Sequence, residues 1–189
     1  MLVGGPRNPT RSPIALPLRT LVASHCVLEP LVVAHAREMF DVLSDPAIYE
    51  FENAPPKSLG WLTERYAVLE RRGSADGAQQ WLNWAIRLPG GELAGYVQAT
   101  VEPSGTCYVA YELTSRYWRR GIGRSAVRAM LDELASAYDA RQFVAVLKSA
   151  NHRSWGLLAN LGFRPADAQE AARFSPESDE RVMLKAVEP

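Results

Sequence analysis

Residues 117–126 read YWRRGIGRSA and lie between two segments of different character. A strand-like run, CYVAYEL at residues 107–113, precedes them, and a helical run at residues 125–138 follows. The Gly-x-Gly spacing lets the backbone turn tightly and lets a ligand approach main-chain N–H groups. Because the start of a helix also favours anions, the stretch suits a pyrophosphate or a pair of phosphates. The alternative is a plain glycine turn before a surface helix.

Three arginines, Arg119, Arg120 and Arg124, surround this turn, and guanidinium groups recognise phosphate well. Residues 121–126 also match the dinucleotide-binding pattern G-x-G-x-x-A. That pattern opens a series of βα units and is followed by an acidic residue that holds a ribose hydroxyl. Here too few residues remain, and the next strand ends in Leu-Lys-Ser, so a dinucleotide fold is disfavoured.

The composition indicates a single soluble globular domain. Of 189 residues, 47% are apolar and 22% are charged, with 21 acidic and 21 basic side chains. Without a net charge, nucleic acid is not an expected partner. Two cysteines and three scattered histidines do not predict a disulfide scaffold or a metal site. No apolar run approaches the roughly 18 residues of a membrane span, so we expect no membrane and a cytoplasmic location.

The periodicity predicts the order of the elements. Residues 1–15 are rich in Pro, Gly and Arg and predict a flexible N-terminal leader, followed by one domain over residues 16–189. A first strand is expected within residues 16–28, and a helix that starts near Pro30. Ser58 is the expected N-cap of a second helix.

From residue 81 onward the apolar residues alternate, which predicts an antiparallel meander of three strands ending at Leu113. The segment FVAVL at residues 143–147 is nearly all apolar, as expected of a central strand paired in parallel across a helix. Residues 165–180 are polar and are expected to include a mobile loop. The fold class is therefore mixed α/β (α+β), with a mostly antiparallel sheet flanked by helices.

The segment from Tyr108 to Phe163 resembles the GNAT superfamily of amine N-acetyltransferases. The shared pieces, in order, are VAYEL (109–113), WRRGIG (118–123), FVAVL (143–147), NHRS (151–154) and LANLGF (158–163). The loop resembles that family's Q/R-x-x-G-x-G/A pyrophosphate motif, with Trp118 in place of the first Gln or Arg. The front half is similar to the branch that contains ribosomal-protein N-terminal alanine acetyltransferases, and the whole resemblance spans roughly residues 18–187.

The resemblance implies an acyl-CoA N-acyltransferase fold in which the strand before the loop and the strand before NHRS splay apart. Acetyl-CoA is then the implied cosubstrate, with Leu113 and Thr114 along its pantetheine arm. The implied contacts of the pyrophosphate are Arg119, Arg120, Gly121, Ile122, Gly123 and Arg124. An amine would attack the thioester directly, so proximity and orientation supply most of the acceleration.

Two proton transfers need side chains. The resemblance offers Ser154 to protonate the leaving thiolate and Asn151 to bond the pantetheine arm; alternatively, both only cap a helix. Glu112 is the one carboxylate on the strand before the loop and is the candidate base, unless it is a solvent-facing strand residue. Tyr108, Tyr111 or a chain of waters could replace it.

The sequence therefore predicts an N-acetyltransferase that moves an acetyl group from acetyl-CoA to a primary amine. The alternative is a non-catalytic acyl-CoA-binding module of the same fold. Trp61, Trp81 and Trp84, with Tyr49 and Phe51, either line the acceptor pocket or belong to the core. The acceptor and the oligomeric state stay open, although a homodimer is the commonest oligomer.

Overall fold

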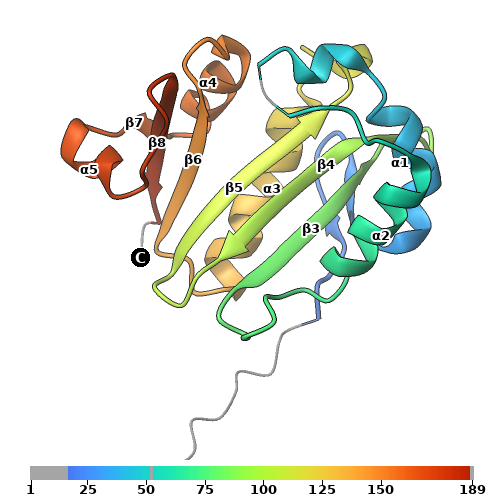
Figure 1. The fold of residues 1–189 in the computed structure, drawn as a ribbon, viewed down its shortest axis with the longest axis horizontal. Helices are drawn as coiled ribbons and strands as arrows, with labels where there is room; N and C mark the ends of the chain where they lie inside the picture. The colour runs from blue at the N-terminus through green and yellow to red at the C-terminus, as the bar shows by residue number, and fades with distance from the viewer. Residues whose placement is uncertain (1–16, 52, 188–189) are drawn as a thin grey trace, which may run out of the picture.

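The computed structural model of the protein describes residues 17–51 and 53–187, and eight strands form one sheet across it (Figure 1). The strands are β1 (Leu21–Val22), β2 (Val27–Pro30), β3 (Gln80–Arg87), β4 (Leu93–Val101), β5 (Thr106–Leu113), β6 (Gln142–Lys148), β7 (Arg164–Pro165) and β8 (Glu180–Ala186). Their order in the sheet is β1-β2-β3-β4-β5-β6-β8-β7. Only the β5–β6 pair is parallel among these strands, so the predicted mixed, mostly antiparallel sheet is confirmed.

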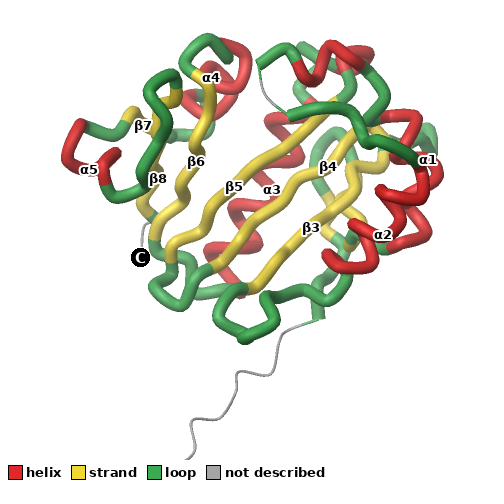
Figure 2. The backbone as a smooth tube through the Cα atoms, in the orientation of Figure 1, coloured by secondary structure: helices red, strands yellow, loops and turns green. Residues whose placement is uncertain are grey.

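The α-helices cover the two faces of the sheet unequally (Figure 2). They are α1 (Ala36–Val42), α2 (Leu59–Leu69), α3 (Ile122–Ala137), α4 (His152–Ala159) and α5 (Ala168–Ala172). Helix α3 crosses behind β4 and β5, where Met130 and Leu134 pack against Trp84 and Val97 in the main core. Helices α1 and α2 cover the opposite face near β3, through Met39, Leu62 and Tyr66 among others. The sheet's front face is therefore buried only in part.

Strands β5 and β6 separate along their length, as the family resemblance implied. They pair only where Thr106, Cys107 and Tyr108 face Gln142, Phe143 and Val144. Beyond Tyr108, β5 continues to Leu113 paired only with β4, and a gap opens toward the upper ends of β5 and β6 in Figure 1. Backbone groups on the inner edges of the two strands therefore face this gap instead of each other.

Local residue choices explain where several elements begin. The Ser58 hydroxyl accepts a hydrogen bond from the Trp61 backbone N–H at 3.1 Å, so the predicted N-cap of α2 is confirmed. Helix α5 begins with a capping box in which Asp167 and Glu170 bond each other's backbone N–H groups. The polar segment 165–180, predicted to include a loop, contains this short helix followed by turns and irregular chain at residues 173–179.

Of two predictions near the start of the chain, one is confirmed and one is wrong. The first strand expected within residues 16–28 is β1, and the short strand β2 follows it. Pro30 does not start a helix; it ends β2, opposite Trp84. Helix α1 begins only at Ala36, after a 3₁₀ turn at Val33–His35, because tertiary pairing with β3 outweighs the local preference of proline for a helix start. The predicted leader lies outside the described residues. Among the residues that are described, no helix is long and apolar enough to cross a membrane.

Candidate active site

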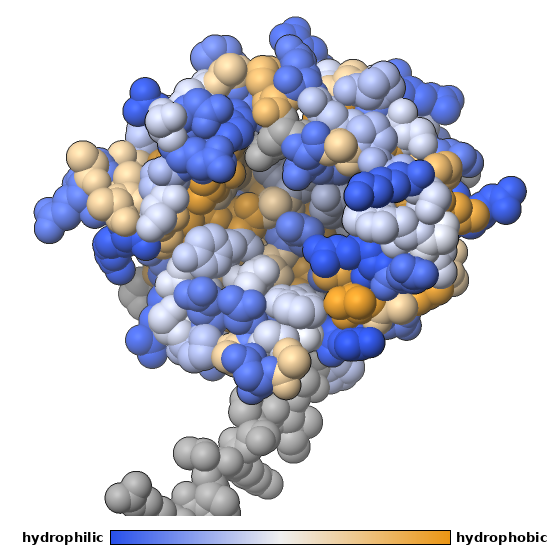
Figure 3. Space-filling view, viewed as in Figure 1, coloured by the Kyte–Doolittle hydropathy of each residue, from blue (hydrophilic) through white to orange (hydrophobic). Residues whose placement is uncertain are grey.

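A cavity of about 1200 Å³ opens on the front face of the sheet. Figure 3 shows this face hollowed, with hydrophobic residues inside and hydrophilic residues around the rim. We call one part the loop half, lined by Leu113, Arg119, Gly121, Ile122, Gly123, Arg124, Asn151 and Ser154. The other part, the sheet half, is lined by Tyr49, Tyr66, Asn83, Tyr96, Gln98 and Glu112. The two halves are continuous.

The glycine loop presents its main chain to the cavity. Arg119 and Gly121 both adopt left-handed backbone conformations, with φ of 59° and 77°, whereas Arg120 between them does not. Such alternation directs successive N–H groups into a concave surface that binds anions. Gly121 is also the N-cap of α3, and no side chain bonds the first amides of that helix. These amides and the helix dipole suit a pyrophosphate.

Three contacts hold the bend between β5 and the loop. The Trp118 indole N–H donates to the Leu113 carbonyl at 2.7 Å. Asp45, which precedes the 3₁₀ turn Pro46–Tyr49, accepts from the Thr114 hydroxyl at 2.8 Å and from the Ser115 N–H at 2.7 Å. Burial tends to raise the pKa of Asp45, but the hydrogen bonds from Ser115 and Thr114 outweigh it and leave the pKa lowered. A distant carboxylate therefore fixes the loop's entry.

Thr114 and Arg120 lie away from the positions that the family resemblance implied, which were along the pantetheine arm and beside the pyrophosphate. The Thr114 hydroxyl bonds Asp45, and its N–H donates to the Ala94 carbonyl at 2.9 Å. The Arg120 guanidinium lies 5.7 Å from the Tyr117 ring centroid. Neither residue lines the cavity, while Arg119 and Arg124 do. Of the three loop arginines, the structure brings two to the cavity.

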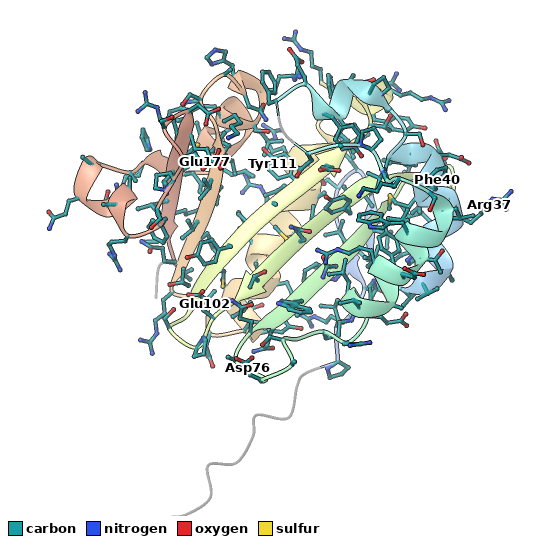
Figure 4. All side chains as sticks on the ribbon, viewed as in Figure 1. Arg37, Phe40, Asp76, Glu102, Tyr111 and Glu177 are labelled. Carbon is teal, nitrogen blue, oxygen red and sulfur yellow. The ribbon has the colours of Figure 1, made fainter. Side chains whose placement is uncertain are left out.

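The start of α4 forms the opposite wall of the loop half. Asn151 is the N-cap, and its side-chain oxygen accepts from the Ser154 N–H at 3.1 Å. Ser154 is therefore the third residue of the helix and not its cap. The Tyr111 hydroxyl donates to the Ser154 carbonyl at 3.3 Å and bridges the gap between β5 and α4 (Figure 4). Burial raises the pKa of Tyr111 to about 12, so this donor stays protonated.

Glu112 lies in the sheet half, directly opposite Tyr96 on β4. The Asn53 side-chain amide donates to its carboxylate at 3.4 Å. Burial raises the pKa of Tyr49, Tyr66 and Tyr96, and the negative charge of Glu112 raises each of them further. The carboxylate therefore faces neutral hydroxyl groups inside the cavity. It is not the plain solvent-facing strand residue that was the alternative.

Some aromatic candidates lie in the cavity and others do not. Tyr49, Phe51 and Trp61 line it. Trp84 is fully buried in the main core, and Trp81 is outside the cavity lining. Tyr108 packs edge-on against Phe174, with 6.1 Å between ring centroids, and does not line the cavity.

The lining residues that the sequence did not single out include four with polar side chains in the sheet half: Tyr66, Asn83, Tyr96 and Gln98. The strand register gives a signal for three of them, because Asn83 pairs with Gln98 and Tyr96 pairs with Glu112 across neighbouring strands. A polar band on one face of a half-covered sheet marks a site. Tyr66 gave no such signal, because its ring belongs to the apolar face of α2.

Arg153 closes part of the rim above the cavity. Its guanidinium lies 4.3 Å from the Trp118 ring centroid and 5.3 Å from that of Phe51. It also forms a salt bridge with Glu50. These contacts link α4 to the segment after the 3₁₀ turn Pro46–Tyr49.

Within residues 17–51 and 53–187, no group of three or more His, Cys, Asp or Glu side chains could hold a metal ion. Across the same residues, the cavity joins the amides of the loop half to the Glu112 carboxylate and the hydroxyl groups of the sheet half.

Comparison with known proteins supports this description. Residues 25–164 match the family model of the acetyltransferase (GNAT) domain. Similar solved structures include Mycobacterium smegmatis RimJ in complex with CoA-disulfide (17% identity, TM-score 0.75, covering 90% of this chain and 88% of that one). Another is the ribosomal-protein-S5-alanine acetyltransferase from Vibrio fischeri (18% identity, TM-score 0.72, 90% and 97%).

A third is the microcin C7 self-immunity acetyltransferase MccE in complex with acetyl-CoA and AMP (15% identity, TM-score 0.70, 87% and 93%). At these identities the structures show a shared fold, whereas the family model spans most of the chain and reaches from the β1–β2 hairpin to β7. It includes the splayed strands, the glycine loop and the start of α4. The chain belongs to the GNAT acetyltransferase family.

Proposed function

We propose that the protein transfers the acetyl group of acetyl-CoA to a primary amine by direct nucleophilic attack. One observation carries this proposal: a single cavity joins the anion-binding amides of the loop, the gap between β5 and β6, and the Glu112 carboxylate. Cofactor and acceptor would therefore meet in one space without a covalent enzyme intermediate.

The loop half has the features that acetyl-CoA needs. Amides around Gly121 would hold the pyrophosphate, with Arg119 and Arg124 beside them. The free inner edges of β5 and β6 would bond the amides of the pantetheine arm, as when a peptide adds to a sheet edge. Leu113 and the Asn151 amide nitrogen would flank that arm. The similar structures of RimJ in complex with CoA-disulfide and of MccE in complex with acetyl-CoA and AMP support this cosubstrate.

The transfer then needs proximity and two proton movements. Glu112 takes one proton from the acceptor ammonium, and the neutral amine nitrogen attacks the thioester carbonyl carbon. The new C–N bond forms, the C–S bond breaks, and the second proton passes from nitrogen to the thiolate through the Ser154 hydroxyl. Amide, free thiol and protonated Glu112 result, and Glu112 returns its proton to solvent. An α-amine, with a pKa near 8, requires less of the base than a lysine amine near 10.4.

A panel of primary amines defines the first assay, and it includes the alanine acceptor named for one relative. The purified protein would be incubated with acetyl-CoA and a panel that contains a peptide with a free N-terminal alanine, lysine, spermidine and an aminoacyl nucleotide analogue. We expect acetyl-CoA to bind, NAD not to bind, and at least one amine to release CoA thiol faster than buffer does. Binding without turnover of any amine would favour the non-catalytic acyl-CoA-binding module instead. The homodimer and the cytoplasmic location stay predictions from the sequence.

A further inference from the structure

Tyr66 carries a buried hydroxyl group, and the apolar packing of its ring gives no reason for a polar group at this position. The residue lies on α2 and is only 3% exposed, with its ring among the apolar residues between α1, α2 and the sheet. Its hydroxyl oxygen has no hydrogen-bond partner among the described residues, yet the residue lines the cavity. A buried hydroxyl without a partner destabilises the fold relative to phenylalanine. A ligand that fills the cavity and bonds this oxygen would recover that loss.

The surroundings of the hydroxyl indicate the charge of the missing partner. The negative charge of Glu112 acts on the hydroxyls of Tyr49, Tyr66 and Tyr96 from within the same half of the cavity. The Tyr49 hydroxyl is already committed, since it donates to the Leu43 carbonyl at 2.8 Å. Arg65, which also lines the cavity, is exposed to solvent. The sheet half therefore combines a carboxylate with a neutral oxygen that is free to accept.

Such a pair suits an ammonium group. A primary ammonium has three N–H donors and no acceptor, so it needs several oxygen atoms around it. A neutral alcohol of the same shape would have one donor and would gain little from the carboxylate. Burial strengthens the difference, because charge-assisted hydrogen bonds are stronger away from water.

We propose that Tyr66 and Glu112 form the binding site for the acceptor's ammonium group, and that Tyr66 determines the preference for cationic primary amines. The proposal rests on the proposed acetyl transfer, whose acceptor it describes. The Tyr66 oxygen accepts one N–H of the ammonium while Glu112 accepts another. After Glu112 has taken its proton, Tyr66 holds the neutral amine in place for attack. Tyr66 is thus a positioning residue, and Glu112 alone moves the proton.

The chain contains a matched control. Tyr138, at the end of α3, carries the other buried hydroxyl without a partner in the described part of the chain. It is 7% exposed and does not line the cavity. Tyr66→Phe and Tyr138→Phe remove the same group from equally buried sites. Both variants should therefore melt at or above the wild-type temperature, and only one should change amine recognition.

The test is equilibrium binding of phenethylamine and of its neutral analogue 2-phenylethanol to the CoA-loaded protein. We expect the wild type and Tyr138→Phe to bind the amine at least tenfold more tightly than the alcohol. In Tyr66→Phe the amine affinity should fall about tenfold while the alcohol affinity changes less than twofold. With the best acceptor from the panel, KM should rise about tenfold in this variant and kcat should change less than threefold.

Two results would overturn the proposal. The first is a wild type that binds the amine no better than the alcohol. The second is an amine affinity that Tyr66→Phe leaves unchanged or that Tyr138→Phe lowers equally. Either result can occur while acetyl-CoA still binds and an amine is still acetylated, which would leave the proposed function intact. Failure of acetyl-CoA itself to bind would instead remove the proposed function.

Discussion

The two halves of the cavity differ in the groups that they present, which are mainly backbone amides in the loop half and side chains in the sheet half. The anion-binding wall of the loop half consists of main-chain groups that are close in sequence, because Arg119, Gly121 and the first turn of α3 lie within a few residues. The sheet half consists of side chains from α2, β3, β4, β5 and the 3₁₀ turn Pro46–Tyr49, which only the folded structure brings together. Binding by backbone amides depends on the conformation of the main chain and tolerates substitutions that keep it. Chemistry by side chains depends on which residues are present and tolerates small shifts of the main chain.

This difference implies that substitutions should separate cofactor binding from acceptor chemistry. Changes of conformation in the loop should weaken acetyl-CoA, and changes of functional group in the sheet half should slow transfer with the cofactor still bound.

Replacing Glu112 with Gln should give the largest effect on turnover. The amide has nearly the same shape but cannot take a proton, so kcat/KM for the amine should fall by about 10²- to 10³-fold. Release of CoA thiol measures the rate, and calorimetric titration should show unchanged acetyl-CoA affinity. A rate within threefold of wild type would assign the base to water or to another residue.

Replacing Ser154 with Ala should lower kcat by roughly tenfold or more, the low end of acid–base effects, because the thiolate loses its nearest proton donor. The helix start should survive, since the bond from the Ser154 N–H to Asn151 involves the backbone. Rates with a thioester whose leaving thiol is more acidic provide the check. A more acidic thiol needs less help to leave, so the variant should lose less of its rate with that thioester than with acetyl-CoA. An equal loss of rate with both thioesters would mean that Ser154 is not the proton donor.

Replacing Arg153 with Ala should have a moderate effect on the rim. The variant loses the stacking on Trp118 and Phe51 and the salt bridge to Glu50, contacts worth about 1 kcal/mol together at an exposed site. We expect KM for the amine to rise about fivefold. Glu50→Gln removes only the salt bridge, so steady-state kinetics should show less than half of that effect. An equal effect in both variants would contradict a stacking role.

Replacing Asp45 with Asn should change stability more than activity. The folded-state pKa of Asp45 is lowered, so its charged hydrogen bonds stabilise the fold above the unfolded pKa of about 3.9 and are lost as the pH falls through the folded value. At pH 7 the variant should be less stable by about 1.5 kcal/mol, with a shallower loss of stability in acid. Urea unfolding at several pH values measures both effects.

Asp76→Asn is the matched control for the loop. Asp76 also has a lowered pKa, caused by hydrogen bonds from Ser74 and Ala78, but it lies outside the cavity lining. Acetyl-CoA affinity should fall a few-fold in Asp45→Asn, because Thr114 and Ser115 lose their anchor, and should not change in Asp76→Asn. Equal affinities in both variants would mean that Asp45 does not fix the loop.

The sequence predicts those parts of the fold that depend on residues close together in the chain. The cap at Ser58, the meander and the parallel crossover follow from periodicity and turn residues, and the glycine loop is contiguous in the chain. Pro30 misled because its pairing with β3 is a tertiary effect that no local rule contains. The hydrogen bonds of Asp45 to a loop about 70 residues away are likewise tertiary contacts that no local pattern indicates.

The residues of the sheet half could be predicted from the sequence only in part. Glu112 could be singled out because its strand holds one carboxylate, and the register then adds Tyr96 and Gln98 to the same face. Tyr66 could not be found this way. Its ring belongs to the apolar face of α2, and only the folded structure shows that this residue lines the cavity and that its buried hydroxyl has no partner among the described residues.

The central claim is that the loop binds acetyl-CoA through its backbone conformation, and calorimetric titration of Gly121→Val tests it most directly. At a φ of 77° a β-branched residue is strained, while the space beside Gly121 would accept a Cβ, with His25 no nearer than 3.5 Å. Gly77→Val is the control, since Gly77 has a φ of 70° and lies outside the cavity lining. We predict that acetyl-CoA affinity falls at least 100-fold in Gly121→Val and is unchanged in Gly77→Val and Glu112→Gln. Wild-type affinity in Gly121→Val, or equal losses in the three variants, would contradict the claim.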